Sequence, residues 1–90
     1  MRINEYEVRV TARTSLSEEA LEAIPGSLAG YYAAAGWHAS EEKMVVVATV
    51  YTRSPWSAIQ RIMLGLRSWA TRYDVSIKRA NVTCTLKREG

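Results

Sequence analysis

The chain has 90 residues, of which 48% are apolar, and this content fits one domain built around a single core. Its 12 Lys and Arg residues exceed its nine acidic residues by three, which is a mild basic excess. The single cysteine, Cys84, excludes an internal disulfide, and no apolar run approaches the ~20 residues of a membrane-spanning helix. We therefore expect one domain over residues 1–90, located in the cytoplasm.

The first predicted element is a strand over residues 5–13, where apolar and polar side chains alternate as in a strand buried on one face. Residues 15–18 read Ser-Leu-Ser-Glu, which fits a capping box at the start of a helix. Apolar residues then recur at helical spacing until Pro25 and Gly26. The sequence predicts a short helix that begins near Ser15 and stops at this Pro-Gly pair.

The reading of residues 28–39 leaves two alternatives. Three alanines at 33–35 favour a helix, whereas Tyr31, Tyr32, Trp37 and two glycines favour a strand beside a close neighbour. We interpret this segment as a strand. The polar residues 40–43 then predict a hairpin loop that leads into a third strand over residues 44–52. Both faces of this third strand are largely apolar, which is typical of a central strand.

The next element is an amphipathic helix that begins after Ser54. Ser54 can cap the first turn, and Pro55 suits the first helical position because no amide proton is needed there. Leu64 lies on the polar side of this helix and is expected to be exposed. At 100° per residue, one broad stripe is expected to face a sheet. It consists of Trp56, Ile59, Ile62, Met63, Leu66, Trp69 and Ala70.

The last predicted element is a strand over residues 74–88 whose apolar positions change parity. A β-bulge near residues 78–80 would return both sets of apolar side chains to one face. The element order β-α-β-β-α-β resembles the ferredoxin-like split βαβ arrangement. This resemblance implies an α+β sandwich in which a four-stranded antiparallel sheet has the spatial order 4-1-3-2 and two helices cover one face.

The sequence carries no recognisable catalytic constellation. His38 is the only histidine, and no cysteine or carboxylate pair stands at metal-ligand spacing around it. No nucleophile elbow and no glycine-rich phosphate loop is present. Cys84 alternates with apolar neighbours and is expected to face the core. We therefore expect no enzymatic activity, no cofactor and no bound metal.

The main functional hypothesis is a small protein-interaction module. A part-apolar sheet face left open by the helices is typical of a contact with a protein partner, or with a second copy in a homo-oligomer. High Ala and Arg content is typical of a GC-rich coding sequence. This composition is compatible with an accessory protein of an actinobacterial phage or of its host. The residues expected to make the contact are Val45, Val47, Thr49, Tyr51, Thr83, Thr85 and, on the helix, Leu64.

The alternative hypothesis is weak nucleic-acid binding without sequence preference, through phosphate contacts. Two features argue against an RNA-recognition domain: the third strand lacks the Arg/Lys-Gly-aromatic signature, and the first strand would expose two carboxylates. The residues expected to contact phosphates are Arg61, Arg72, Arg79, Lys87 and Arg88.

Overall fold

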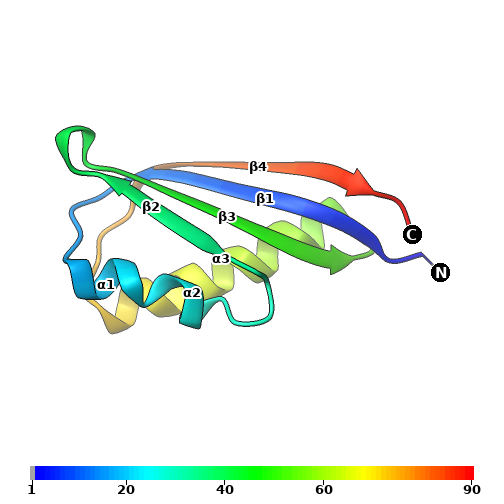
Figure 1. The fold of residues 1–90 in the computed structure, drawn as a ribbon, viewed down its shortest axis with the longest axis horizontal. Coiled ribbons are helices and arrows are strands. Elements are labelled where there is room, and N and C mark those ends of the chain that lie inside the picture. Colours follow the sequence, from blue (N-terminus) through cyan, green and yellow to red (C-terminus); the bar gives the residue numbers. More distant parts are fainter. Residues whose placement is uncertain (1) are drawn as a thin grey trace.

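Four antiparallel strands form one sheet, and the helices all lie against one of its faces (Figure 1). The computed structural model describes residues 2–90, apart from the side chain of Ala39. The strand order is β2-β3-β1-β4, so the first and third strands are central, as expected. The elements are β1 (Asn4–Arg13), α1 (Glu18–Glu22), α2 (Ile24–Ser27), β2 (Ala34–His38), the 3-10 helix η1 (Ala39–Glu41), β3 (Lys43–Thr52), α3 (Pro55–Arg72) and β4 (Lys78–Arg88).

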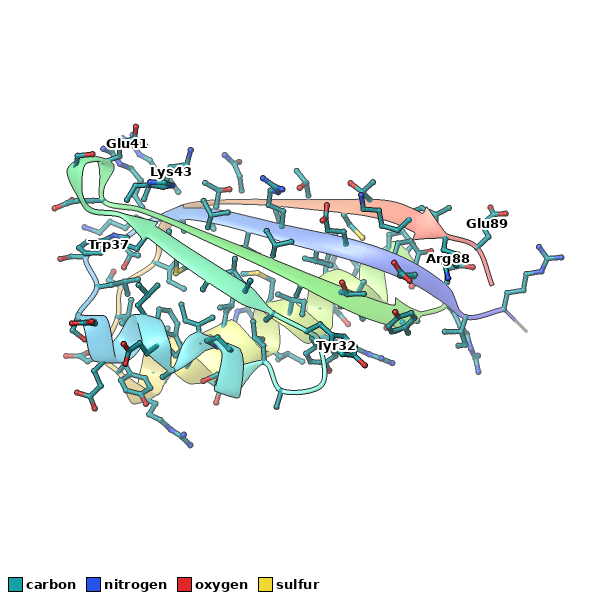
Figure 2. All side chains as sticks on the ribbon, in the orientation of Figure 1. Tyr32, Trp37, Glu41, Lys43, Arg88 and Glu89 are labelled. Carbon is teal, nitrogen blue, oxygen red and sulfur yellow. The ribbon has the colours of Figure 1, made fainter. Side chains whose placement is uncertain are left out.

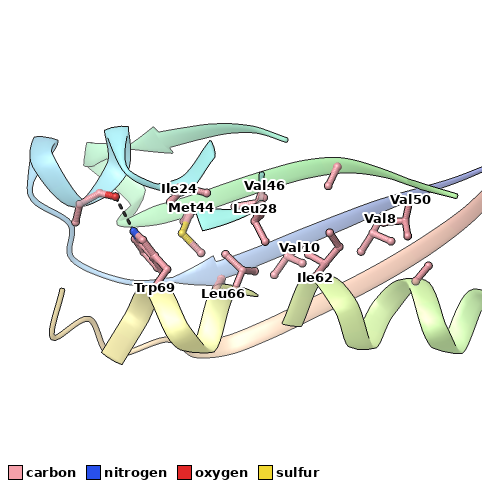
Figure 3. Packing of buried hydrophobic residues seen from close by; sticks show 14 of the residues in the cluster. Val8, Val10, Ile24, Leu28, Met44, Val46, Val50, Ile62, Leu66 and Trp69 are labelled. Carbon is pink, nitrogen blue, oxygen red and sulfur yellow. Dashed lines mark hydrogen bonds between the residues drawn. The ribbon is translucent and has the colours of Figure 1, made fainter. Parts of the chain in front are cut away.

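The core lies between the two central strands and the long helix α3 (Figure 3). The alternation predicted for β1 is confirmed, since Val8 and Val10 are buried and pair with Ala48 and Val46 of β3, which are buried as well. Burying each such aliphatic side chain contributes roughly 1.5–3 kcal/mol. The buried set of the core comprises Tyr6, Val8, Val10, Ala12, Leu16, Ala20, Ile24, Leu28, Met44, Val46, Ala48, Val50, Ala58, Ile62, Leu66 and Trp69.

The first helix differs from the prediction at both ends. Its cap is Ser17 and not Ser15, because the Ser17 hydroxyl accepts a hydrogen bond from the Ala20 amide at 3.1 Å. Pro25 does not stop the helical region. It lies in the first turn of a second short helix, α2, where a residue without an amide proton is tolerated. The single predicted helix is therefore two helices, α1 and α2, which meet at Ala23.

The second strand is shorter than predicted. Residues 28–32 form a turn in which Gly30 and Tyr32 have φ angles of 91° and 49°, and β2 begins only at Ala34, opposite Val47. Tyr31 packs against the core from this turn, and Trp37 does so from the strand. Because Tyr31 in the turn and Trp37 in the strand are both partly buried aromatic residues, the sequence pattern does not distinguish the turn from the strand.

The predicted start of α3 is confirmed, because the Ser54 hydroxyl accepts a hydrogen bond from the Ser57 amide at 3.1 Å and Pro55 opens the helix. The buried stripe is Ala58, Ile62, Leu66 and Trp69. The prediction for Trp56 is wrong: its side chain is 67% exposed. At 100° per residue, Trp56 lies roughly 120° around the helix from the centre of the buried stripe, so it projects beyond the sheet.

The final strand begins at Lys78 and not at residue 74, although Val75 and Ile77 still pack against the core. The predicted bulge is confirmed. Thr11 and Arg13 on β1 pair with Asn81 and Lys78, so two residues of β4 stand opposite the single position between them. This insertion explains the change of parity along β4.

Replacing Gly65 by alanine is expected to lower the free energy of unfolding by about 1 kcal/mol. The added methyl group would collide with the buried Leu28 side chain and lie 3.3 Å from the Ser27 carbonyl oxygen. Overpacking costs ~1–3 kcal/mol, which exceeds the ~1 kcal/mol that alanine gains over glycine inside a helix. Gly26→Ala is the matched control, since its methyl group meets no atom within 4 Å. Urea unfolding that finds Gly65→Ala as stabilising as Gly26→Ala would contradict this packing.

Candidate functional site

The sheet face opposite the helices is uncovered within residues 2–90, and we call it the outer face (Figure 2). Its central row joins Val47 to Arg9 and Arg9 to Thr83, and the next row joins Thr49 to Glu7 and Glu7 to Thr85. The valines on this face are half-buried, and Tyr51 is 51% exposed. The register thus places six of the seven predicted contact residues on one surface: Val45, Val47, Thr49, Tyr51, Thr83 and Thr85.

Leu64 belongs to a different surface. It is 64% exposed on α3, as expected, but α3 lies on the opposite side of the sheet from the outer face. Leu64 lines a shallow hollow along the helix together with Trp56, Ile59 and Met63, and Gln60 and Arg67 complete its rim. We call Trp56, Ile59, Met63 and Leu64 the helix patch. The sequence does not reveal this patch, because its periodicity places Trp56, Ile59 and Met63 on the stripe expected to face the sheet.

One end of the outer face is basic. Lys43 pairs with Arg13, and Arg13 pairs on its other side with Lys78, so three cations stand in one row across three strands. His38 pairs with Lys43 at the edge and is exposed. The sequence pattern alone does not reveal this row, because Arg13, Lys43 and Lys78 become neighbours only through the register of three strands.

The hairpin end also carries backbone strain. Four residues other than glycine in the described chain have φ between 48° and 53°, and three of them, Glu42, Asp74 and Arg79, line one polar hollow with Arg13 and Lys78. Left-handed backbone at such residues costs about 1–3 kcal/mol each and is enriched at functional sites. Glu42 and Asp74 share this hollow with Arg13, Lys78 and Arg79, so its lining carries two carboxylates and three cations.

The other end of the outer face holds a tyrosine whose titration is shifted. A hydrogen bond to the Glu5 carboxylate, together with the negative charge of Glu5, raises the pKa of Tyr51 above its usual value. Glu5 and Tyr51 stand directly opposite each other on β1 and β3. Glu7 lies 4.0 Å from the Lys87 ammonium, both groups being partly exposed, so this ion pair contributes little.

Replacing Glu5 by glutamine is expected to return the pKa of Tyr51 towards its ordinary value. Because the folded pKa is raised, the neutral phenol is the favoured form, and the contact stabilises the fold below the ordinary phenol pKa. This stabilisation is lost as the pH rises through the raised pKa. An NMR titration of the tyrosine rings measures the shift. An unchanged midpoint in Glu5→Gln would show that the carboxylate is not its cause.

The five cations expected to contact phosphates do not form one surface. Arg61 approaches the Tyr51 carbonyl oxygen at 3.5 Å, at the end of the sheet where Lys87 and Arg88 lie. Arg72 and Arg79 lie at the opposite end, in the last turn of α3 and at the start of β4. At ~3.3 Å per strand residue, Arg79 and Arg88 are roughly 30 Å apart. The structure therefore divides the predicted set into two groups.

Cys84 is half-buried on the helix side of β4, opposite the buried Val8. Desolvation raises the pKa of its thiol. At neutral pH the thiol is therefore protonated, which is the less nucleophilic form.

Among the described residues, no group of three His, Cys, Asp or Glu side chains is placed to hold a metal ion. None of the helices described for residues 2–90 combines the length and apolarity that crossing a membrane requires. No protein-family model matches the chain, and a search of curated proteins finds no matching sequence.

Proposed function

We propose that this chain is a non-enzymatic protein-interaction module that binds a partner protein through its outer face. The observation that carries the proposal is the pair Val45 and Val47, which stands in the middle of a sheet face that no described helix covers. Aliphatic side chains at the centre of a patch with a charged rim are typical of protein contacts.

Charge favours an acidic protein over a second copy as the occupant of the outer face. This face carries two acidic side chains of β1, Glu5 and Glu7, and the cations named below outnumber them. A second copy stacked face to face would bring one basic surface onto another, which is unfavourable. An acidic rim on the partner would complement the cations of this face, which are Arg9, Arg13, Lys43, Lys78, Lys87 and Arg88.

We also propose that the fold is ferredoxin-like, with α1 and α2 together in place of the first helix. The strand order β2-β3-β1-β4 and the position of all helices on one face support this assignment. The proposal concerns fold alone, because such folds host many unrelated functions. The function of this chain therefore has to be argued from its surfaces.

The test is affinity capture from source cells, with mass spectrometry of the retained proteins, using the wild-type chain and two variants. Val47→Glu places a negative charge at the centre of the outer face, and Ala29→Glu places the same charge at an exposed turn residue away from it. We expect Val47→Glu to capture at least tenfold less of an acidic protein than the wild-type chain does, and Ala29→Glu to capture as much as the wild-type chain. Equal capture by all three proteins would contradict the proposal. Self-association of this chain through the outer face, detected by light scattering, would also contradict it.

A further inference from the structure

The helix side of β4 is poorly covered. Val82, Cys84 and Leu86 pair with Val10, Val8 and Tyr6, which are buried, so they point to the same side of the sheet. Yet Val82 and Cys84 are only half-buried, and Leu86 is 45% exposed. The core therefore thins out at this edge of the sheet.

The helix patch lies beside the same edge. Gly65 faces Leu28, next to α2, and Ile59 and Met63 lie roughly 120–160° around α3 from Gly65, on its opposite flank. Since α1 and α2 contact β2 while α3 contacts β3, β1 and β4, this opposite flank of α3 lies on the β4 side of the helix layer. Trp56 and Leu86 are both exposed, and we call the surface between the helix patch and the apolar side chains Val82, Cys84 and Leu86 the edge groove.

The edge of β4 is available for strand pairing. Within residues 2–90, β4 pairs with β1 alone, so the peptide groups along its other side have no strand partner. The strand is 11 residues long, and it is exposed along most of its length. An unpaired edge of this length is a template for another strand unless charged side chains prevent pairing.

Charge decides which strand the edge can accept. Three Arg residues lie on α3 and four cations on β4, and neither element contains Asp or Glu. The five remaining cations share the rest of the chain with all nine acidic residues. Antiparallel pairing of two β4 strands centred on Thr83 would set Lys78 against Arg88 and Arg79 against Lys87. A second copy is therefore repelled, whereas an acidic strand is attracted.

We propose that the edge groove binds an extended acidic segment of a partner protein, which adds to β4 as a fifth strand. Alternate apolar side chains of this segment seat between Leu86 and the helix patch, and its acidic side chains meet the cations at both ends of β4. This site goes beyond the proposed function, because its apolar contacts lie on the helix side of the sheet and not on the outer face.

The experiment uses fluorescently labelled synthetic peptides of strand length, with Val, Leu or Ile at alternate positions and Glu or Asp elsewhere. A matched panel carries Lys in place of every acidic residue. We expect the acidic panel to contain binders, the Lys panel to contain none, and the affinity to fall as salt rises. Trp56→Glu and Leu86→Glu should each weaken binding at least tenfold. Tyr32→Glu is the control, since Tyr32 is 78% exposed in the turn before β2.

A second readout reports where the peptide binds. Cys84 lies between Val82 and Leu86 in the edge groove, so bound peptide should slow its reaction with a thiol reagent several-fold. Val47→Glu should bind the peptide as the wild-type chain does, which separates this site from the outer face. A loss of peptide binding in Val47→Glu, with no change in Trp56→Glu, would overturn the edge groove and leave the proposed function standing.

Three further results would overturn the inference. The first is that no acidic peptide binds at millimolar concentration. The second is that a single-stranded oligonucleotide displaces the peptide and protects Cys84 equally well, which would identify a nucleic-acid surface. The third is sedimentation equilibrium that finds a dimer of the wild-type chain which Trp56→Glu dissociates, because a second copy would then occupy the groove.

Discussion

Replacing Trp69 by alanine is expected to lower the free energy of unfolding by about 3–5 kcal/mol, enough to unfold much of a small domain. Trp69 is 1% exposed and is the largest side chain in the core (Figure 3). Its indole nitrogen donates a hydrogen bond to the Ala20 carbonyl oxygen at 2.7 Å, which ties α3 to α1. Urea unfolding followed by circular dichroism measures the loss.

Trp69→Phe separates the hydrogen bond from the packing. Phenylalanine keeps a ring but has no donor for the Ala20 carbonyl, and an unsatisfied buried acceptor costs about 1–3 kcal/mol. We expect the free energy of unfolding of Trp69→Phe to lie between that of the wild-type chain and that of Trp69→Ala. A loss below ~1 kcal/mol for Trp69→Ala would contradict the position of this side chain in the core.

The second large effect distinguishes the two faces of β3. Val46→Asp places a carboxylate at a position that is fully buried beneath the sheet, which costs several kcal/mol. Val47→Asp places the same group on the outer face, where water can reach it, and should cost less than ~1 kcal/mol. Comparable losses in the two variants, measured by urea unfolding, would show that the outer face is not open.

The loss of unfolding free energy in Val46→Asp is expected to depend on pH. Burial disfavours the charged form, so the pKa of the introduced carboxyl is raised above its unfolded value of about 3.9. The variant is therefore least destabilised at a pH below that value and loses stability as the pH rises through the folded pKa. Val47→Asp, with its carboxyl in water, should lack this dependence. Unfolding curves at acidic and neutral pH test the difference.

The elements with strong local signals were predictable from the sequence. Alternation predicts β1, the apolar run after a polar loop predicts β3, and Ser54 with Pro55 predicts the start of α3, because these features depend on neighbouring residues alone. The exact extent of β2 was not predictable, since its start at Ala34 is set by pairing with Val47 on another strand. The break at Ala23 was missed because a Pro-Gly pair fits a helix end and a first turn equally well.

The candidate surfaces were predictable in part for a similar reason. The outer-face residues of one strand follow from strand parity. The sequence alone therefore predicts that Val45 and Val47 share a face, and the register confirms this prediction. The edge groove depends on where α3 lies beneath the sheet, and hydrophobic periodicity does not determine this. The periodicity therefore predicts Trp56 in the core, although its side chain is 67% exposed.

The most direct test of the outer face is site-specific photo-crosslinking in source cells. A photoreactive amino acid at position 47 stands at the centre of the outer face, and the same amino acid at position 29 stands at the exposed turn residue after α2. We expect a discrete adduct with an acidic protein from position 47 and no such adduct from position 29. Adducts of nucleic acid at position 47, or the same protein adduct from both positions, would contradict it.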